Sequence, residues 1–444
     1  MSEAGIRAES LRRVGPGTVM GEFMRQYWIP AALSSELVAD GDPMRLLLLG
    51  EKLIAFRDTG GRVGIMDHRC PHRCASLFLG RNEDHGIRCV YHGWKFDVDG
   101  NCVEMPNVRP EQQYRDKAPA KAYKVAERNG LIWVYMGKQA EPPPMPMIEA
   151  TLLPEGSRVT AMVQRECNWL QALEGDIDTS HFGFLHAGSV DPDNVPEDHP
   201  IYHPVRNRAP EYHVHDAPWG TQYAAFRNAD EGATYWRFAN FMFPFWTQQP
   251  QGRFPTHVGA RAWVPMDDER TMFLHLQWQP STSGMVPLKD GKQLPGARPT
   301  HEYLPNTSDW TGRWRLAANA GNDWLIDRDA QRENRIYSGI DNIHLQDQAV
   351  TESMGPITDH SREILGPGDQ MIARTRRRLL QAARAFAEKG QAGPGVEDPR
   401  VYWLARSGFF LADGQDHSAW QRLYEAAVEE ATRPVAEAEA AAGA

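Results

Sequence analysis

The stretch that decides the fold is CPHRCASLFLGRNEDHGIRCVYHGWKF, which runs from Cys70 to Phe96. It contains two cysteine–histidine pairs, Cys70-x-His72 and Cys89-x-x-His92, with sixteen residues between them. Thiolates and imidazoles bind zinc, iron–sulfur clusters and copper. The stretch therefore predicts a metal site that is built from two short loops.

The order of the four side chains narrows the choice of metal. A structural zinc site with two cysteines and two histidines usually takes both cysteines from one pair and both histidines from the other. Here each pair supplies one side chain of each kind. A Rieske [2Fe–2S] cluster needs this mixture, because two thiolates hold one iron and two neutral imidazoles hold the other. We predict a Rieske cluster, with Trp94 placed to shield it; a zinc site and a metal-free stretch are the alternatives.

The remaining cysteines are given structural roles. The chain has 5 cysteines in 444 residues, and four of the cysteines lie between residues 70 and 102. Such clustering favours a metal over disulfides, and few cysteines in a long chain suggest a reducing compartment. Cys74, Cys102 and Cys167 are expected to be small, packed side chains.

Composition excludes other classes of function. The chain is 41% hydrophobic and 24% charged with a net charge of −10, which is typical of a globular protein that does not bind nucleic acid. It has neither an apolar run of about 18 residues, as a membrane span requires, nor an apolar signal segment near its first residue. We expect a cytoplasmic protein with no membrane partner. The basic stretch Arg374–Leu380 is expected to be a solvated helix face.

Apolar runs and turn signals predict two domains. Residues 27–138 contain short strands, including a hairpin expected at Gly50-Glu51, and a proline-rich linker follows at residues 141–147. Residues 148–430 mix helices and strands, among them an amphipathic helix that ends at Gly390. The predicted class is α+β, with an all-β domain followed by a domain of helices and antiparallel sheet, on which residues 1–26 pack.

A second metal-binding pattern lies in NWLQALEGDIDTSHFGFLH, which ends at His186. Two histidines and a carboxylate with open coordination positions form the facial triad of non-haem iron oxygenases. Asp178 and His181 are three positions apart and are expected to share a helix face. His181 and His186 are five apart, which a regular helix would separate. A π-bulge or a helix break at Gly183 is predicted to bring both imidazoles to one metal.

Both patterns resemble one enzyme family. The spacing C-x-H, sixteen residues, C-x-x-H-G-W-x-F resembles the Rieske domain of Rieske non-haem iron oxygenases, and N-W…E-x-x-x-D-x-x-H-x4-H resembles the motif of their catalytic domain. The resemblance covers essentially the whole chain and is greatest to the phthalate 4,5-dioxygenase group. Glu174-Gly175 stands where many naphthalene-type relatives have Glu-Asn. A helix-grip, START-like catalytic domain is implied.

The resemblance implies a role for each matching residue. His181 and His186 would bind the mononuclear iron, whereas Asp178 would bridge toward the Rieske histidine of a neighbouring subunit. The implied cluster ligands are Cys70, His72, Cys89 and His92. The third iron ligand would come from HLQDQAVTESMGPI, where Asp347 fits the family stretch, and Asp341 and Asp359 are its competitors.

The resemblance also implies the reaction and the partners. A flavin/[2Fe–2S] reductase would pass electrons from NADH to the cluster, and mononuclear Fe(II) would use them with O₂. The family assembles as a homotrimer or as a stacked hexamer. We therefore expect an oxygenase component that hydroxylates an aromatic carboxylate. An O-demethylase of methoxylated aromatic acids is the alternative, followed by a Rieske electron carrier without oxygenase activity and a zinc-stabilised binding protein.

Three side chains are candidates for binding the substrate. Arginine binds carboxylates bidentately, which makes Arg208 and Arg237 candidates for the acid group. Ser180 lies between Asp178 and His181 and could donate a hydrogen bond. For each arginine, a surface position or an ion pair is the competing role.

Overall fold

The computed structural model describes residues 8–278, 286–298 and 300–436. Residues 1–7 of the predicted N-terminal segment lie outside these ranges, as do residues 279–285 and 299 of the predicted second domain. Among the helices within them, none is both long enough and apolar enough to span a membrane.

Two antiparallel sheets form the N-terminal region, as the all-β prediction required. The larger sheet has six strands in the order β1-β10-β9-β4-β3-β2, and the smaller has four in the order β5-β6-β7-β8. The strands are β1 (Trp28–Leu33), β2 (Met44–Leu48), β3 (Glu51–Arg57), β4 (Val63–Asp67), β5 (Arg81–Glu83), β6 (Gly86–Arg88), β7 (Lys95–Phe96), β8 (Cys102–Glu104), β9 (Ala122–Arg128) and β10 (Leu131–Tyr135).

The predicted hairpin is present one residue earlier than expected. Leu48 of β2 pairs with Glu51 of β3, so the two-residue turn is Leu49-Gly50. Both turn residues have positive φ, 46° and 73°, as a tight hairpin turn between twisted strands requires.

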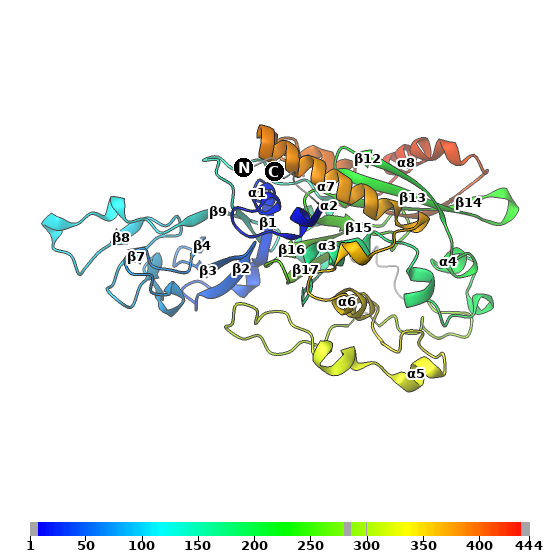
Figure 1. Cartoon of the computed structure of the whole chain (residues 1–444), viewed down its shortest axis with the longest axis horizontal. Helices are drawn as coiled ribbons and strands as arrows, with labels where there is room; N and C mark the ends of the chain where they lie inside the picture. Colours follow the sequence, from blue (N-terminus) through cyan, green and yellow to red (C-terminus); the bar gives the residue numbers. More distant parts are fainter. Residues whose placement is uncertain (1–7, 279–285, 299, 437–444) are drawn as a thin grey trace.

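An eight-stranded antiparallel sheet dominates the rest of the chain. Its order is β11-β17-β16-β15-β14-β13-β12, with β18 paired to β14. The strands are β11 (Arg158–Arg165), β12 (Glu211–Ala217), β13 (Gly220–Asn228), β14 (Thr234–Met242), β15 (Trp246–Gln248), β16 (Gly259–Pro265), β17 (Thr271–Trp278) and β18 (Gly408–Ala412). Figure 1 shows the N-terminal sheets (blue to cyan) extending from one end of this sheet.

Helices cover both faces of the large sheet. The α-helices of the described residues are α1 (Val19–Met24), α2 (Glu149–Leu152), α3 (Trp169–Asp176), α4 (Tyr202–Arg206), α5 (Arg328–Arg332), α6 (Ile343–Ser353), α7 (Gln370–Lys389) and α8 (Trp420–Glu429). Phe238 of β14 packs on Tyr424 of α8 at a ring distance of 5.2 Å. Arg237, next to it, points to the opposite face because side chains alternate along a strand. That opposite face carries Thr247, which donates a hydrogen bond to Asp176 of α3.

The predicted amphipathic helix is confirmed, but the expectation that its basic stretch is a solvated face is corrected. Helix α7 lies across the sheet (Figure 1) and ends at Gly390 in the left-handed conformation that favours glycine. The stretch Arg374–Leu380 is not a simple solvated face. The Arg376 guanidinium is half-buried and donates hydrogen bonds to the carboxylates of Glu174 and Glu363.

The two regions share one hydrophobic core. Trp133 of β10 stacks on Trp246 of β15 with ring centroids 6.0 Å apart. The N-terminal segment also contacts α3, where Trp169 Nε1 donates to the Leu11 carbonyl at 3.1 Å. The division into residues 27–138 and 148–430 stays a prediction.

Candidate metal centres

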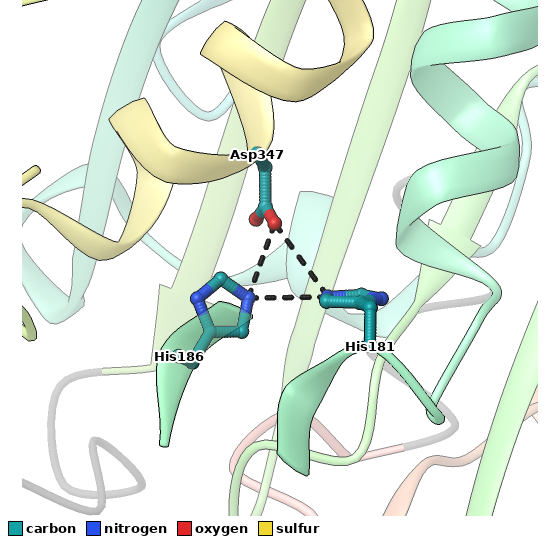
Figure 2. A group of neighbouring side chains, drawn as sticks. All are labelled: His181, His186 and Asp347. Carbon is teal, nitrogen blue, oxygen red and sulfur yellow. Dashed lines mark hydrogen bonds and ion pairs between the residues drawn. The ribbon is translucent and has the colours of Figure 1, made fainter. Parts of the chain in front are cut away.

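Three side chains from two distant segments converge beneath the large sheet (Figure 2). The Nε2 atoms of His181 and His186 are 3.1 Å apart. Asp347 Oδ1 lies 3.1 Å from His186 Nε2 and 3.5 Å from His181 Nε2. We call these three residues the ligand triad.

The local backbone explains how both histidines reach one point. Residues Phe182–His186 form a π-helix, so the predicted π-bulge is confirmed. The expectation of a shared helix face for Asp178 and His181 was wrong, because α3 already ends at Asp176. The two residues meet through a turn instead, in which Asp178 accepts a hydrogen bond from the Ser180 amide at 2.7 Å.

Asp178 orients the first histidine. His181 Nδ1 lies 3.2 Å from Asp178 Oδ2, and Ser180 Oγ donates to Asp178 Oδ1 at 2.7 Å. Burial works to raise the pKa of Asp178, but these hydrogen bonds outweigh it and leave the pKa below its usual value. An ionised carboxylate only accepts, so His181 Nδ1 carries the proton and Nε2 keeps its lone pair.

Gln346 orients the second histidine, and sequence reasoning had given it no role. Its Nε2 donates to the carbonyls of Gly296 and Ile340 at 3.1 and 2.7 Å, which fixes the orientation of the amide. Its Oε1 then faces His186 Nδ1 at 2.7 Å and must accept from it. The signal was its place immediately before Asp347 in the quoted stretch.

The triad fits a bound cation. Both Nε2 atoms carry lone pairs, and they face each other and a carboxylate oxygen within 3.5 Å. Such an arrangement is repulsive unless a proton or a positive ion lies between the atoms. Two nitrogen ligands at right angles, each about 2.1 Å from an ion, lie about 3 Å apart, which is the separation found here.

The two competitors of Asp347 lie elsewhere. Asp341 is exposed and pairs with Arg298 at 3.0 Å. Asp359 caps a short helical turn by accepting from the Ser361 amide. Neither belongs to the triad.

A second group of close ligand atoms does not resemble a metal site. Glu174, His360 and Glu363 lie near one another. The Arg376 guanidinium donates to both carboxylates and supplies the positive charge there. Glu174 therefore anchors α3 to α7.

The two cluster loops share one backbone pattern. Cys70 N donates to the Ala75 carbonyl and Cys89 N to the Trp94 carbonyl, both at 2.8 Å. The fourth residue after each cysteine donates back to that cysteine's carbonyl: Cys74 at 2.8 Å and Gly93 at 2.9 Å. Both of these residues have positive φ, 58° and 77°.

This pattern corrects the expectation for Cys74. Its side chain is exposed, not packed, whereas Cys102 and Cys167 are buried as predicted. Cys74 occupies the left-handed position that Gly93 fills in the other loop.

The four cluster side chains meet at the tips of the loops. Cys70 and Cys89 are each 2% exposed, and the rings of His72 and His92 lie 4.4 Å apart. Burial, together with the neighbouring Cys89 thiol, raises the pKa of Cys70 to about 11, so metal binding must displace its proton. Buried Trp94 stacks on His72 at 4.5 Å, consistent with a shielding role. Buried thiols beside outer imidazoles fit a Rieske cluster.

The predicted substrate residues differ in their surroundings. Arg237 is buried, lies 5.3 Å over the Phe182 ring, and leaves its Nε without a hydrogen-bond partner within the described ranges. Arg208 is partly exposed and lies 5.0 Å over the Phe184 ring. The Ser180 hydroxyl is already bonded to Asp178.

Family models and curated relatives match this architecture. Residues 27–120 match the Rieske [2Fe-2S] domain, and residues 134–441 match the LigXa C-terminal domain like family. The chain is 51% identical to the 3-chlorobenzoate-3,4-dioxygenase oxygenase subunit of Comamonas testosteroni over 95% of this chain and 98% of that protein. It is 36% identical to the phthalate 4,5-dioxygenase oxygenase subunit of Pseudomonas putida, over 88% of each chain.

A further relative and a solved structure agree. The 5,5'-dehydrodivanillate O-demethylase oxygenase subunit of a Sphingobium strain is 30% identical over 88% of this chain and 83% of its own. Dicamba monooxygenase bound to dicamba has the same fold, with a TM-score of 0.54 and 17% identity over 83% of this chain and all of that one.

The chain belongs to the Rieske non-haem iron oxygenases, with an N-terminal Rieske domain and a LigXa-like C-terminal domain. Its cofactors are accordingly a Rieske [2Fe–2S] cluster and a mononuclear iron.

Proposed function

We propose that this chain is the oxygenase component of a multicomponent system that hydroxylates an aromatic carboxylate. It would use O₂ and electrons that a flavin/[2Fe–2S] reductase delivers from NADH, which places it in the cytoplasm. The relatives named for 3-chlorobenzoate and phthalate support this substrate class. Ring dioxygenation is the proposed outcome.

We assign the iron to the ligand triad and the cluster to the two loops. The proposed cluster ligands are Cys70, His72, Cys89 and His92. When bound, the two centres supply the electron transfer and O₂ chemistry that side chains lack. Asp178 and Gln346 keep the imidazoles in the tautomer that presents Nε2.

The buried, unpaired charge of Arg237 is the observation that favours an acid as the substrate. Buried charges are normally paired. Its guanidinium lies near the triad, because Phe182 contacts both Arg237 and the His186 ring, the latter at 5.7 Å. Its Nη2 donates to the Pro250 carbonyl at 3.3 Å, and no ion pair of Arg237 is found within the described residues. A substrate carboxylate would supply the missing anion. Arg208 and Ser180 remain weaker candidates, since each already has a contact of its own.

We propose that electrons cross between subunits of a homotrimer, single or stacked. Val90 and Tyr91 beside His92 are more than half exposed at the loop tip, as an interface would require. Asp178 and His181 keep 19% and 27% of their side chains exposed. Asp178 would accept a hydrogen bond from the His92 ring of a neighbouring subunit and, at the same time, one from His181.

The O-demethylase alternative has its own support in the similarity to the dehydrodivanillate enzyme. A product screen with a surrogate reductase separates the two. Halobenzoates and phthalate isomers should give dihydrodiols; formaldehyde from methoxybenzoates alone would establish the alternative. Reduction of the cluster without any product from any acid would leave an electron carrier.

The carboxylate assignment has a separate test. Arg237→Met should weaken binding of 3-chlorobenzoate, measured by calorimetry, about tenfold or more, and should not affect 3-chlorobenzamide. Arg206→Met is the matched control, because Arg206 is a surface arginine that pairs with Asp193. Equal losses for acid and amide would rule out a carboxylate contact.

A further inference from the structure

Three histidines lie on the Asp347 side of the ligand triad and take no part in the interactions described above. They are His275 on β17, His344 on α6 and His301 in the segment between these elements. The rings of His275 and His344 are 5.6 Å apart, and His301 stacks on His344 at 5.3 Å. We call these residues the imidazole cluster.

Helix periodicity and sheet register place this cluster beside the triad. His344 precedes Asp347 by three positions on α6, so both project from the same side of the helix. His275 lies opposite Arg261 of β16, and Arg261 donates to Asp176 at the end of α3. His275 therefore lies on the sheet face that meets the helices carrying the triad.

Two ring nitrogens of the cluster lack partners. Nε2 of His275 and Nε2 of His301 are buried and have no hydrogen bond to any residue in the described ranges. His275 and His344 are 6% and 9% exposed. Buried polar groups are normally paired with protein, water or a ligand. These nitrogens point to a polar partner outside the described residues, a place that a bound ligand can fill.

The surroundings favour an oxygen acceptor. Arg165 of β11 lies over the Trp263 and Phe273 rings at 4.8 and 5.2 Å, and its Nε has no hydrogen-bond partner in the described residues. Burial and the Arg261 guanidinium hold the pKa of His275 well below its usual value, so this ring is neutral and one of its two nitrogens carries a proton that it can donate. Guanidinium charge and imidazole N–H groups attract oxygen lone pairs.

We propose that the imidazole cluster hydrogen-bonds an oxygen substituent of the substrate ring. Strands β15 and β16 separate it from Arg237 of β14. The inference rests on the proposed function, in which Arg237 takes the carboxylate. The imidazole cluster then selects aromatic acids that carry a second oxygen group, such as hydroxyl, alkoxy or a further carboxylate, over halogenated acids of the same shape.

The test compares acids that differ only in this group. Calorimetry would give the dissociation constants of 3-hydroxybenzoate and 3-chlorobenzoate, and of the corresponding 4-substituted pair. The protein would be loaded with its [2Fe–2S] cluster and its mononuclear iron. In His275→Phe, the preference for hydroxyl over chlorine should fall about tenfold in at least one pair, as the loss of one hydrogen bond predicts. His275→Gln keeps an N–H near the position of Nε2 and should restore the wild-type ratio.

Controls separate this role from a structural one. His213→Phe alters an imidazole in a ring stack on the other face of the sheet, near Trp420, and should leave both ratios unchanged. His301→Phe replaces His275→Phe if the latter does not fold. Unchanged ratios in a folded His275→Phe or His301→Phe would overturn the inference, even where Arg237→Met weakens both acids. If the wild-type protein binds none of the acids, the proposed function fails first and the inference with it.

Discussion

The two metal-binding regions of this chain are built in opposite ways. The cluster loops are close in sequence, and their shape comes from backbone hydrogen bonds that repeat from one loop to the other. The triad joins a π-helix to α6, and its imidazoles are held by the side chains of Asp178 and Gln346, the latter 160 positions from His186. The first site is local in sequence and is shaped by backbone hydrogen bonds. The second depends on tertiary packing and on side chains that hydrogen-bond the histidine ligands.

The largest expected effect tests the tertiary site. Asp347→Ala removes one of three converging ligands, so turnover should fall below detection while the visible spectrum of the cluster is unchanged. Asp341→Ala, the nearby exposed aspartate, is the control and should stay active. Iron content and product formation are the measurements. An active Asp347→Ala protein would mean that the triad is not the iron site.

Asp178→Asn tests whether a carboxylate is needed beyond the metal. The amide can still accept from His181 Nδ1 but has no charge, so both metals should remain bound. Turnover should fall about 100-fold, the upper end for loss of such a partner. Stopped-flow oxidation of the reduced cluster is the measurement, with Asp191→Asn, on an exposed cap, as the control. Wild-type oxidation rates would remove Asp178 from the electron route.

Gln346→Leu tests the second orienting side chain. Without its acceptor, His186 can turn or change tautomer, and iron affinity should fall about 10–100-fold. Competition with a chelator measures this loss. Gln348→Leu, on the same helix, removes a hydrogen bond to Glu352 and should leave iron affinity unchanged. Equal losses in both variants would indicate damage to α6 and not to the site.

The smallest effect concerns the backbone-made site. Cys74→Gly places glycine at a left-handed position, so the cluster spectrum should persist and stability should rise by up to about 1 kcal/mol. Thermal unfolding is the measurement. Cys102→Gly, at a buried strand position, should destabilise instead. Loss of the cluster in Cys74→Gly would show that the thiol has a role in binding.

The same contrast explains what could be predicted from sequence. The cluster loops are defined by the spacing of their ligands and by their glycines. All four proposed ligands and the β-rich scaffold could therefore be predicted from the sequence. The π-helix could be predicted because the five-residue spacing of His181 and His186 does not fit a regular α-helical turn. Cys74 was misjudged because the repeat between the loops exists in hydrogen bonds and not in residue types.

Tertiary partners were less legible. Asp347 was found through its neighbours, yet Gln346 beside it had no assigned task until the amide was seen between two carbonyls and an imidazole. Arg376 was expected to be solvated because its acidic partners lie outside α7, Glu174 on α3 and Glu363 in the segment before α7. The imidazole cluster joins β17, α6 and an irregular segment, so no single stretch reveals it.

The long separation between His186 and Asp347 also concerns folding. An ion held by both closes a loop that contains strands β12 to β17, and the entropy that such closure removes from an unfolded chain grows only with the logarithm of loop length. A metal that binds the folded chain alone adds stability in proportion to the logarithm of its concentration over its dissociation constant. Iron would thus stabilise the folded chain in addition to its part in the reaction. A cell short of iron would then hold less of this chain in folded form as well as less activity.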